Sequence, residues 1–228
     1  MKQTSITKLS EVYNNLKNLY DGKQIAHDYK SLANLIQDVI RAEAITKPKG
    51  SKFDIYNYVC KDDFRPMMCG VYHEDGWRIA SDAHVLFAEK FEYPEEFEGK
   101  SLLKDGHFIE QGKYPKWRSV IPDGKEYVPY EFDVQKFYDW LEEKRAAWKT
   151  EYGKGIKFGY YWRVCIGPAL LKAELFDKLV TAMTQICATQ LFVKDPRSAV
   201  YAKTDKGVVL LMPTIQSNTD DSNVVTLA

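Results

Sequence analysis

Hydrophobic residues recur at helical spacing in four parts of the chain. These runs cover residues 6–19, 29–43, 134–141 and 169–184, and a Gly-Pro pair precedes the last of them. Apolar side chains at positions i, i+3, i+4 and i+7 form one face of an amphipathic helix, which is buried against another element. We therefore predict four helices, the third with Asp133 as its N-cap and the fourth started by the Gly-Pro pair.

Between the helical runs the pattern changes to that of β-strands. Aromatic and β-branched residues or strict alternation predict strands at 53–59, 67–72, 127–132 and 156–166, and around Leu191, Val200 and Leu210. Glu74-Asp75-Gly76 follows the second of these strands. Since glycine takes positive φ without strain, this tripeptide predicts a tight hairpin turn.

Three stretches of the chain predict less regular structure. Residues 80–86 have too few turn formers for a loop and are too short for a helix, so we expect a strand, a corner and a second strand. Residues 89–113 are acidic and rich in turn formers, which predicts a surface connection with one short hairpin. Residues 217–228 are polar and then briefly apolar, and we expect this tail to be partly ordered at most.

Composition favours a globular protein that does not coat DNA. Of the 228 residues, 45% are hydrophobic and 14% aromatic, enough for a packed core. Lys plus Arg equals Asp plus Glu at 32 each, so net charge gives no reason to expect tight non-specific binding of nucleic acid. No run approaches the ~18 apolar residues of a membrane span, and the N-terminus lacks an apolar leader. We expect a cytoplasmic protein without membrane contact.

The side chains that could carry catalysis or bind metal form no convincing constellation. The four cysteines have neither C-x-x-C spacing nor a neighbouring histidine, which predicts reduced thiols and no zinc site. Asp82 and His84 could act as an acid–base pair, but no nucleophile or metal ligand accompanies them. Gly153-Lys154-Gly155 lacks the rest of a P-loop. We therefore expect no enzyme, no metal and no cofactor.

Three separated motifs occur in an order that a known family shares. The first is Ala80-Ser81-Asp82-Ala83-His84-Val85-Leu86 with residues 65–70 before it, the second is residues 114–122, and the third is residues 208–213. In this order they resemble the middle-domain signature Ala-Thr-Asp-Gly-His-Arg-Leu, the interdomain segment and the C-terminal strand of the bacterial sliding clamp, the β subunit of DNA polymerase III. The resemblance implies an α+β, DNA-clamp-like fold, in which β-α-β-β-β units pack helices on antiparallel sheet.

The resemblance also implies a domain organisation. Residues 89–113 stand where the clamp family has the entire second half of its middle domain. We expect an N-terminal helical segment at 1–46, a middle-domain half at 47–122, a C-terminal unit at 123–216 and a tail at 217–228.

In the clamp family the matched segments meet at a hydrophobic pocket that captures short peptides of polymerases and clamp loaders. Carried over position by position, the resemblance implies a peptide-binding site at Met68, Ser81, Ala83, His84, Val85, Leu86, Pro115, Val120, Leu210, Met212 and Pro213. An apolar groove that contains methionine suits an extended peptide with Leu or Phe anchors. The alternative is that these residues are simply the core of a β-rich domain.

Three departures from the family pattern affect the expected peptide preference. Ala83 stands where the family usually has Gly, and Val85 stands where it has Arg. Thr214 and Ile215 replace the Met-Arg that usually follows Met-Pro. The pocket would therefore lack a flexible corner and a charged rim group.

A basic row raises a second functional possibility. Because clamp helices line the central hole and contact phosphates, the row could face DNA; it consists of Lys144, Arg145, Lys149 and Lys154. Acidic residues share this region, so a solvated helix face of mixed charge is the simpler interpretation. Two functions stay open: a non-enzymatic module that captures short linear peptides of replication or repair proteins, or a DNA-encircling processivity factor assembled as a ring of several copies.

Overall fold

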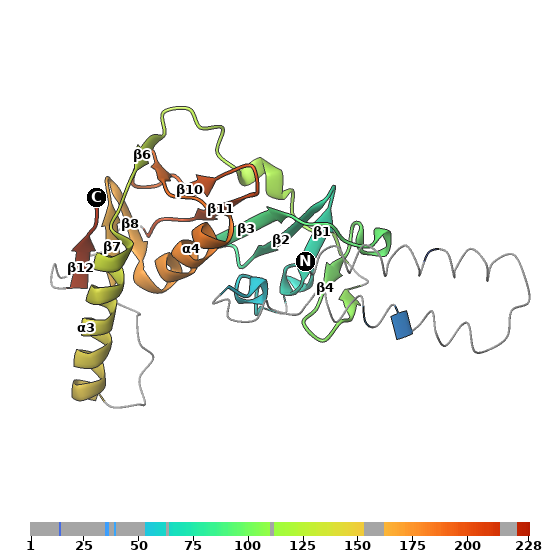
Figure 1. Cartoon of the computed structure of the whole chain (residues 1–228), viewed down its shortest axis with the longest axis horizontal. Coiled ribbons are helices and arrows are strands. Elements are labelled where there is room, and N and C mark those ends of the chain that lie inside the picture. The colour runs from blue at the N-terminus through green and yellow to red at the C-terminus, as the bar shows by residue number, and fades with distance from the viewer. Residues whose placement is uncertain are drawn as a thin grey trace, which may run out of the picture. The chain divides into compact units, whose positions relative to one another are not determined.

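The computed structural model describes residues 14, 35, 36, 39, 53–62, 64–109, 112–152, 162–214 and 223–228, without the side chains of 151 and 152 (Figure 1). The chain divides into two compact units, Met1–Ala80 with Glu89–Tyr114 and Ser81–Ala88 with Pro115–Ala228. The predicted helix at 6–19 lies outside the described residues except for residue 14, as does most of the helix at 29–43. Residues 14, 35, 36 and 39 are helical.

The first unit is built on short antiparallel strands. They are β1 (Val71–Glu74), β2 (Trp77–Ser81), β4 (Ser101–Leu102) and β5 (Phe108–Ile109), in the order β5-β4-β1-β2. Asp75 and Gly76 join β1 to β2 with φ of 51° and 75°. A two-residue turn with positive φ at both positions matches the twist of the strands that it joins, and the predicted hairpin is confirmed.

Two of the predicted strands in this unit are wrong. Residues 53–59 contain the 3₁₀ helix η1 (Ile55–Asn57), because Asp54 Oδ1 accepts a hydrogen bond from the Tyr56 amide at 3.0 Å and caps it. Residues 67–69 belong to the 3₁₀ helix η2 (Pro66–Cys69), whose first position suits the fixed φ of proline. The strand starts only beyond Gly70, where a Cβ would lie 2.9 Å from the Leu102 carbonyl oxygen.

The connection predicted for residues 89–113 contains the expected hairpin but is not purely a surface element. The hairpin is β4–β5, and its first strand extends the sheet beside β1. The short helix η3 (Glu95–Phe97) precedes it. Phe97 and Leu102 are fully buried, so this segment supplies part of the core of the first unit.

The second unit holds a five-strand segment of sheet with two helices. The strands are β3 (Val85–Lys90), β11 (Gly207–Leu211), β10 (Val200–Lys203), β9 (Leu191–Val193) and β6 (Val128–Tyr130), in that order. The last two residues of β3 belong to the first unit. Helix α4 (Ala173–Gln185) packs against β11 through an apolar face that includes Phe176, Leu179 and Met183. This arrangement confirms the α+β prediction of helices on antiparallel sheet.

Helix α3 (Val134–Tyr152) begins where the sequence predicts it. Asp133 Oδ1 accepts hydrogen bonds from the Gln135 and Lys136 amides at 2.8 and 3.0 Å, which confirms the N-cap. Phe137 is buried and meets the Phe176 ring of α4 edge to face, with centroids 4.9 Å apart. The two helices therefore share one core.

A second sheet contradicts the predicted start of the fourth helix. Gly167 and Pro168 do not open a helix; they connect β7 (Arg163–Ile166) to β8 (Ala169–Lys172), and α4 starts only at Ala173. Gly167 has φ of 51°, and a Cβ there would lie 2.5 Å from the Tyr130 ring. The turn is thus fixed by a tertiary contact. Of the strand predicted at 156–166, residues 156–161 lie outside the described part of the chain.

Part of the C-terminal tail is regular. Strand β12 (Val224–Thr226) pairs with β7 in parallel, and Lys136 Nζ donates to the Thr226 carbonyl at 3.0 Å. Val225 and Leu227 are buried. Residues 223–228 thus contribute to the second sheet and to its core, and residues 215–222 lie outside the described part of the chain.

His73 is the buried titratable group of the first unit that most clearly predicts a pH dependence. It is 2% exposed, and the Tyr93 and Phe97 rings pack edge-on against it at 5.0 and 5.1 Å. Its Nδ1 lies 3.4 Å from the Lys100 carbonyl oxygen. Burial lowers the pKa of His73 from 6.5 to about 3. The imidazole is therefore neutral in the fold.

We predict that acid destabilises the first unit through His73. Between pH 6.5 and about 3 the unfolded chain binds one more proton at this residue than the folded chain, so stability rises with pH across that window. His73 contributes at most about 1.4 kcal/mol per pH unit to this change in the free energy of unfolding. We expect the free energy of unfolding, measured with urea between pH 4 and 7, to rise less steeply with pH in His73→Gln than in wild type. Replacing the exposed His107 by Gln is the control; equal slopes for all three proteins would contradict the prediction.

Candidate functional site

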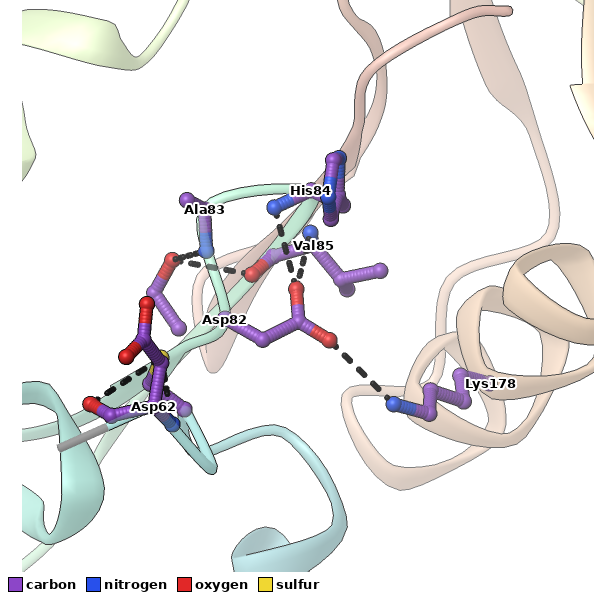
Figure 2. A network of polar contacts seen from close by, with 8 residues as sticks. Asp62, Asp82, Ala83, His84, Val85 and Lys178 are labelled. Carbon is purple, nitrogen blue, oxygen red and sulfur yellow. Dashed lines mark hydrogen bonds and ion pairs between the residues drawn. The ribbon is translucent and has the colours of Figure 1, made fainter.

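Residues 81–85 form a tight corner that is held by its own hydrogen bonds (Figure 2). Ser81 Oγ donates to the Val85 carbonyl at 2.9 Å and accepts from the Ala83 amide at 3.2 Å. Asp82 Oδ1 accepts from the His84 and Val85 amides at 3.0 and 2.8 Å. These bonds offset the cost of Ala83, whose φ of 71° is unfavourable for a residue with a Cβ. The predicted strand, corner and strand are confirmed.

Two further contacts connect the corner to distant parts of the second unit. Asp82 Oδ2 accepts from Lys178 Nζ of α4 at 3.3 Å, and both side chains are mostly buried. The Met212 amide, just beyond β11, donates to the His84 carbonyl at 2.9 Å. Two residues later, the Thr214 amide donates to the Leu170 carbonyl of β8 at 2.7 Å. The segment 212–214 therefore links the corner to the second sheet.

The hydrogen bond between Met212 and His84 determines which side chains share a face. It joins the end of β11 to the start of β3, so these neighbouring strands run antiparallel. Pairing Met212 with His84 places Leu210 opposite Leu86, and alternation puts all four on one face of the sheet. Val85 belongs to the opposite face, and in Figure 2 its side chain points away from that of His84.

The shared face has a buried floor and exposed edges. Leu86 and Leu210 are each 4% exposed, whereas Met212 is 42% exposed and His84 is also exposed. Met212 is therefore a large exposed apolar side chain next to buried apolar side chains on the same face. We call the side chains of His84, Leu86, Leu210 and Met212 the Met212 face.

The other residues of the predicted peptide site fall into three groups. Ser81, Ala83 and Pro213 adjoin the Met212 face, in the corner or directly beyond β11. Pro115 and Val120 are exposed in the segment around the 3₁₀ helix η4 (Trp117–Val120) of the same unit. Val85 is buried on the opposite face of the sheet, and Met68 is buried in η2 of the first unit. The structure thus places the corner next to the end of β11, whereas the Val85 side chain lies on the other face of the sheet.

Three of the four residues predicted to contact DNA, Lys144, Arg145 and Lys149, lie on α3. Lys144 is half-buried and Lys149 is exposed, and Lys154 lies outside the described residues. Arg145 Nη2 lies 3.8 Å from Asp177 Oδ2 of α4, so part of its charge is already balanced within the fold. Glu142 and Glu143 are exposed on the same helix. This face of α3 carries mixed charge.

Lys178 is the residue at this site that the sequence did not identify. It lies on the exposed flank of an amphipathic helix, where a lysine is ordinary, and its partner is 96 positions away. A local pattern gives no signal for such a pair. Its role follows only from the fold.

The described residues contain neither a metal-binding cluster nor a membrane-spanning helix. Among the described residues, no cluster of three or more His, Cys, Asp or Glu side chains is arranged to hold a metal ion. Within the same ranges, no helix combines the length and the apolar character needed to cross a membrane. The four cysteines, all among the described residues, form no disulfide.

Comparison with solved structures supplies the fold family. A β sliding clamp from C. crescentus, with polyethylene glycol bound at its proposed β-motif tethering region, matches with a TM-score of 0.51 and 13% identity over 70% of this chain and 61% of that one. A DnaN sliding clamp from Bartonella birtlesii bound to griselimycin matches with 0.50 and 11% over 71% and 62%. The DNA polymerase III subunit β of Borrelia burgdorferi, in complex with a natural product, matches with 0.50 and 11% over 71% and 60%.

These likenesses concern the fold and only part of each clamp. No family model matches the chain, and no curated protein matches it in sequence. The chain spans 60–62% of the length of the three clamps. At identities of 11–13% the similarity establishes the fold alone. The chain therefore has the fold of the bacterial sliding clamp, the β subunit of DNA polymerase III.

Proposed function

We propose that the protein is a non-enzymatic, clamp-like binding module that captures short linear peptides of replication or repair proteins on the Met212 face. The observation that carries the proposal is the hydrogen bond between the Met212 amide and the His84 carbonyl. It joins two segments 128 positions apart, 212 minus 84, into one surface, and both segments belong to the sliding-clamp motifs of the sequence.

The chemistry of the Met212 face suits an extended peptide with apolar anchors. Leu86 and Leu210 give a dry floor, and the flexible, polarisable Met212 side chain can adapt to a Leu or aromatic group placed beside it. A face of this kind buries little area, and the peptide loses conformational freedom when it binds. We therefore expect a dissociation constant of about 1–100 μM.

The solved clamps support this location without establishing it. The C. crescentus clamp holds polyethylene glycol at its proposed β-motif tethering region, and the B. birtlesii clamp is bound to griselimycin. Where the clamp signature has Arg, this chain has the buried Val85. The proposed site therefore gains no charge from this position, and we expect weaker selection for acidic groups in the peptide.

Met212→Glu tests the proposal. A carboxylate on the Met212 face should weaken binding of a peptide with Leu and Phe anchors by at least about tenfold, because the apolar anchor would have to desolvate it. The fold should survive, since Met212 is 42% exposed in the free protein. Calorimetric titration measures the affinity, and thermal melts of the same samples measure the fold.

Val128→Glu is the matched control. Val128 is 53% exposed on β6 of the same unit, and this substitution introduces the same charge away from the Met212 face. It should leave peptide affinity within about twofold of wild type. Absence of binding by the wild type, equal losses in the two variants, or unfolding of Met212→Glu would each contradict the proposal.

The proposal also predicts weak DNA binding. Net charge is zero, and Arg145 is paired with Asp177, so α3 offers little positive field to phosphates. Fluorescence anisotropy with a linear duplex should give a dissociation constant of about 1 μM or weaker, as expected for non-specific contacts with phosphates. The affinity should fall steeply between about 50 and 200 mM salt. Tight binding that resists salt would favour a DNA-encircling role, and Lys149→Gln would then identify the helix face involved.

A further inference from the structure

One ion pair connects the corner at residues 81–85 to the helical layer of the second unit. We propose that Lys178 is a positioning residue: through Asp82 and His84 it fixes the backbone that presents Met212, and it does so without touching the captured peptide. The predicted effect on peptide binding rests on the proposed function. The predicted effect on the corner can be measured in the free protein.

A series of contacts runs from Lys178 to Met212, and Figure 2 shows its first part, from Lys178 through Asp82 to the corner. Lys178 Nζ donates to one oxygen of the Asp82 carboxylate at 3.3 Å, and the other oxygen accepts from the His84 amide at 3.0 Å. The His84 carbonyl then accepts from the Met212 amide at 2.9 Å. Asp82 Oδ1 also accepts from the Val85 amide at 2.8 Å, and this amide belongs to the same peptide group as the His84 carbonyl. A change in the orientation of the Asp82 carboxylate therefore alters the peptide plane that holds Met212.

Lys178 is attached to a rigid base. Phe176 and Leu179 are fully buried and Val180 is 4% exposed, so the backbone of α4 on both sides of Lys178 is fixed by the core. The ammonium group therefore reaches Asp82 from a constant position. A rigid support of this kind can set the orientation of a neighbouring carboxylate.

The corner needs such support because its backbone is not intrinsically stable. Ala83 has a φ of 71°, a conformation that residues other than glycine avoid unless other contacts enforce it. Asp82 provides two of those contacts through a single oxygen, Oδ1. The side chains of Lys178 and Asp82 are 28% and 19% exposed, so water screens their attraction less than at an open surface.

Variants at both ends of the pair test the inference. Lys178→Met removes the charge and keeps most of the stem, and Lys178→Arg keeps the charge. Asp82→Asn keeps an oxygen that can accept from the His84 and Val85 amides but loses the ionic partner. Lys203→Met is the control, because Lys203 is an exposed lysine of the same unit at the end of β10. Two quantities are measured: the affinity for the Leu and Phe peptide, and amide hydrogen exchange at His84, Val85 and Met212 in the free protein.

Lys178→Met and Asp82→Asn should each weaken peptide binding about tenfold and speed exchange at the Met212 amide about tenfold. The double variant should be no worse than either single variant, because both remove the same interaction. Lys178→Arg and Lys203→Met should stay within about twofold of wild type in both measurements. Thermal melts should show all four single variants folded.

The outcomes separate the possible failures. If Lys178→Met weakens peptide binding but leaves amide exchange unchanged, Lys178 contacts the peptide directly. If peptide affinity and amide exchange are both unchanged, the ion pair does not position the corner. Either result overturns the inference. If Lys178→Met does not fold, Asp82→Asn decides by the same criteria. If wild type binds no peptide, the proposed function fails, and the exchange measurements alone decide whether Lys178 positions the corner.

Discussion

The backbone hydrogen bond from Met212 to His84 is the contact on which the exposed surface of the second unit depends. It sets the pairing between β3 and β11, and the pairing decides which side chains face inward. With this register, Val85 and Leu211 are buried on the face opposite to Met212. A shift of one strand by one residue would move each of its side chains to the other face of the sheet.

The same bond explains why an exposed methionine is tolerated. Met212 lies directly beyond β11, next to a corner whose backbone groups are held by Ser81 and Asp82. Its backbone is therefore fixed although its side chain is not covered. Because the backbone is already fixed, a bound ligand would have to order only the side chain of Met212, which lowers the entropic cost of binding.

What the sequence predicts well is governed by neighbours in the chain. The turn at Asp75 and Gly76, the Asp133 cap and the strands around Leu191, Val200 and Leu210 all follow from local chemistry, and the structure contains them. Two of the errors occur where contacts between distant residues dominate. Gly70 lies against the Leu102 carbonyl and Gly167 against the Tyr130 ring, and neither contact can be inferred from local spacing.

The candidate site shows the same division. The corner can be predicted from the sequence because Ser81 and Asp82 form hydrogen bonds with backbone groups two to four positions away. The inward direction of Val85 depends on the partner strand, and the role of Lys178 depends on α4, so the sequence alone provides neither. The resemblance to the clamp family identified the segments of the predicted peptide site. Only the pairing of β3 with β11 shows which face of the sheet each side chain occupies.

Methyl resonances of methionine test the peptide-binding surface most directly. The chain has five methionines, and Met183 is buried in α4 of the same unit, so it serves as an internal reference. In a protein labelled with ¹³C at the methionine methyl groups, titration with a peptide carrying Leu and Phe anchors should shift the Met212 signal progressively to saturation and leave the Met183 signal unmoved. An unmoved Met212 signal at saturating peptide, or shifts confined to other methionines, would contradict the account.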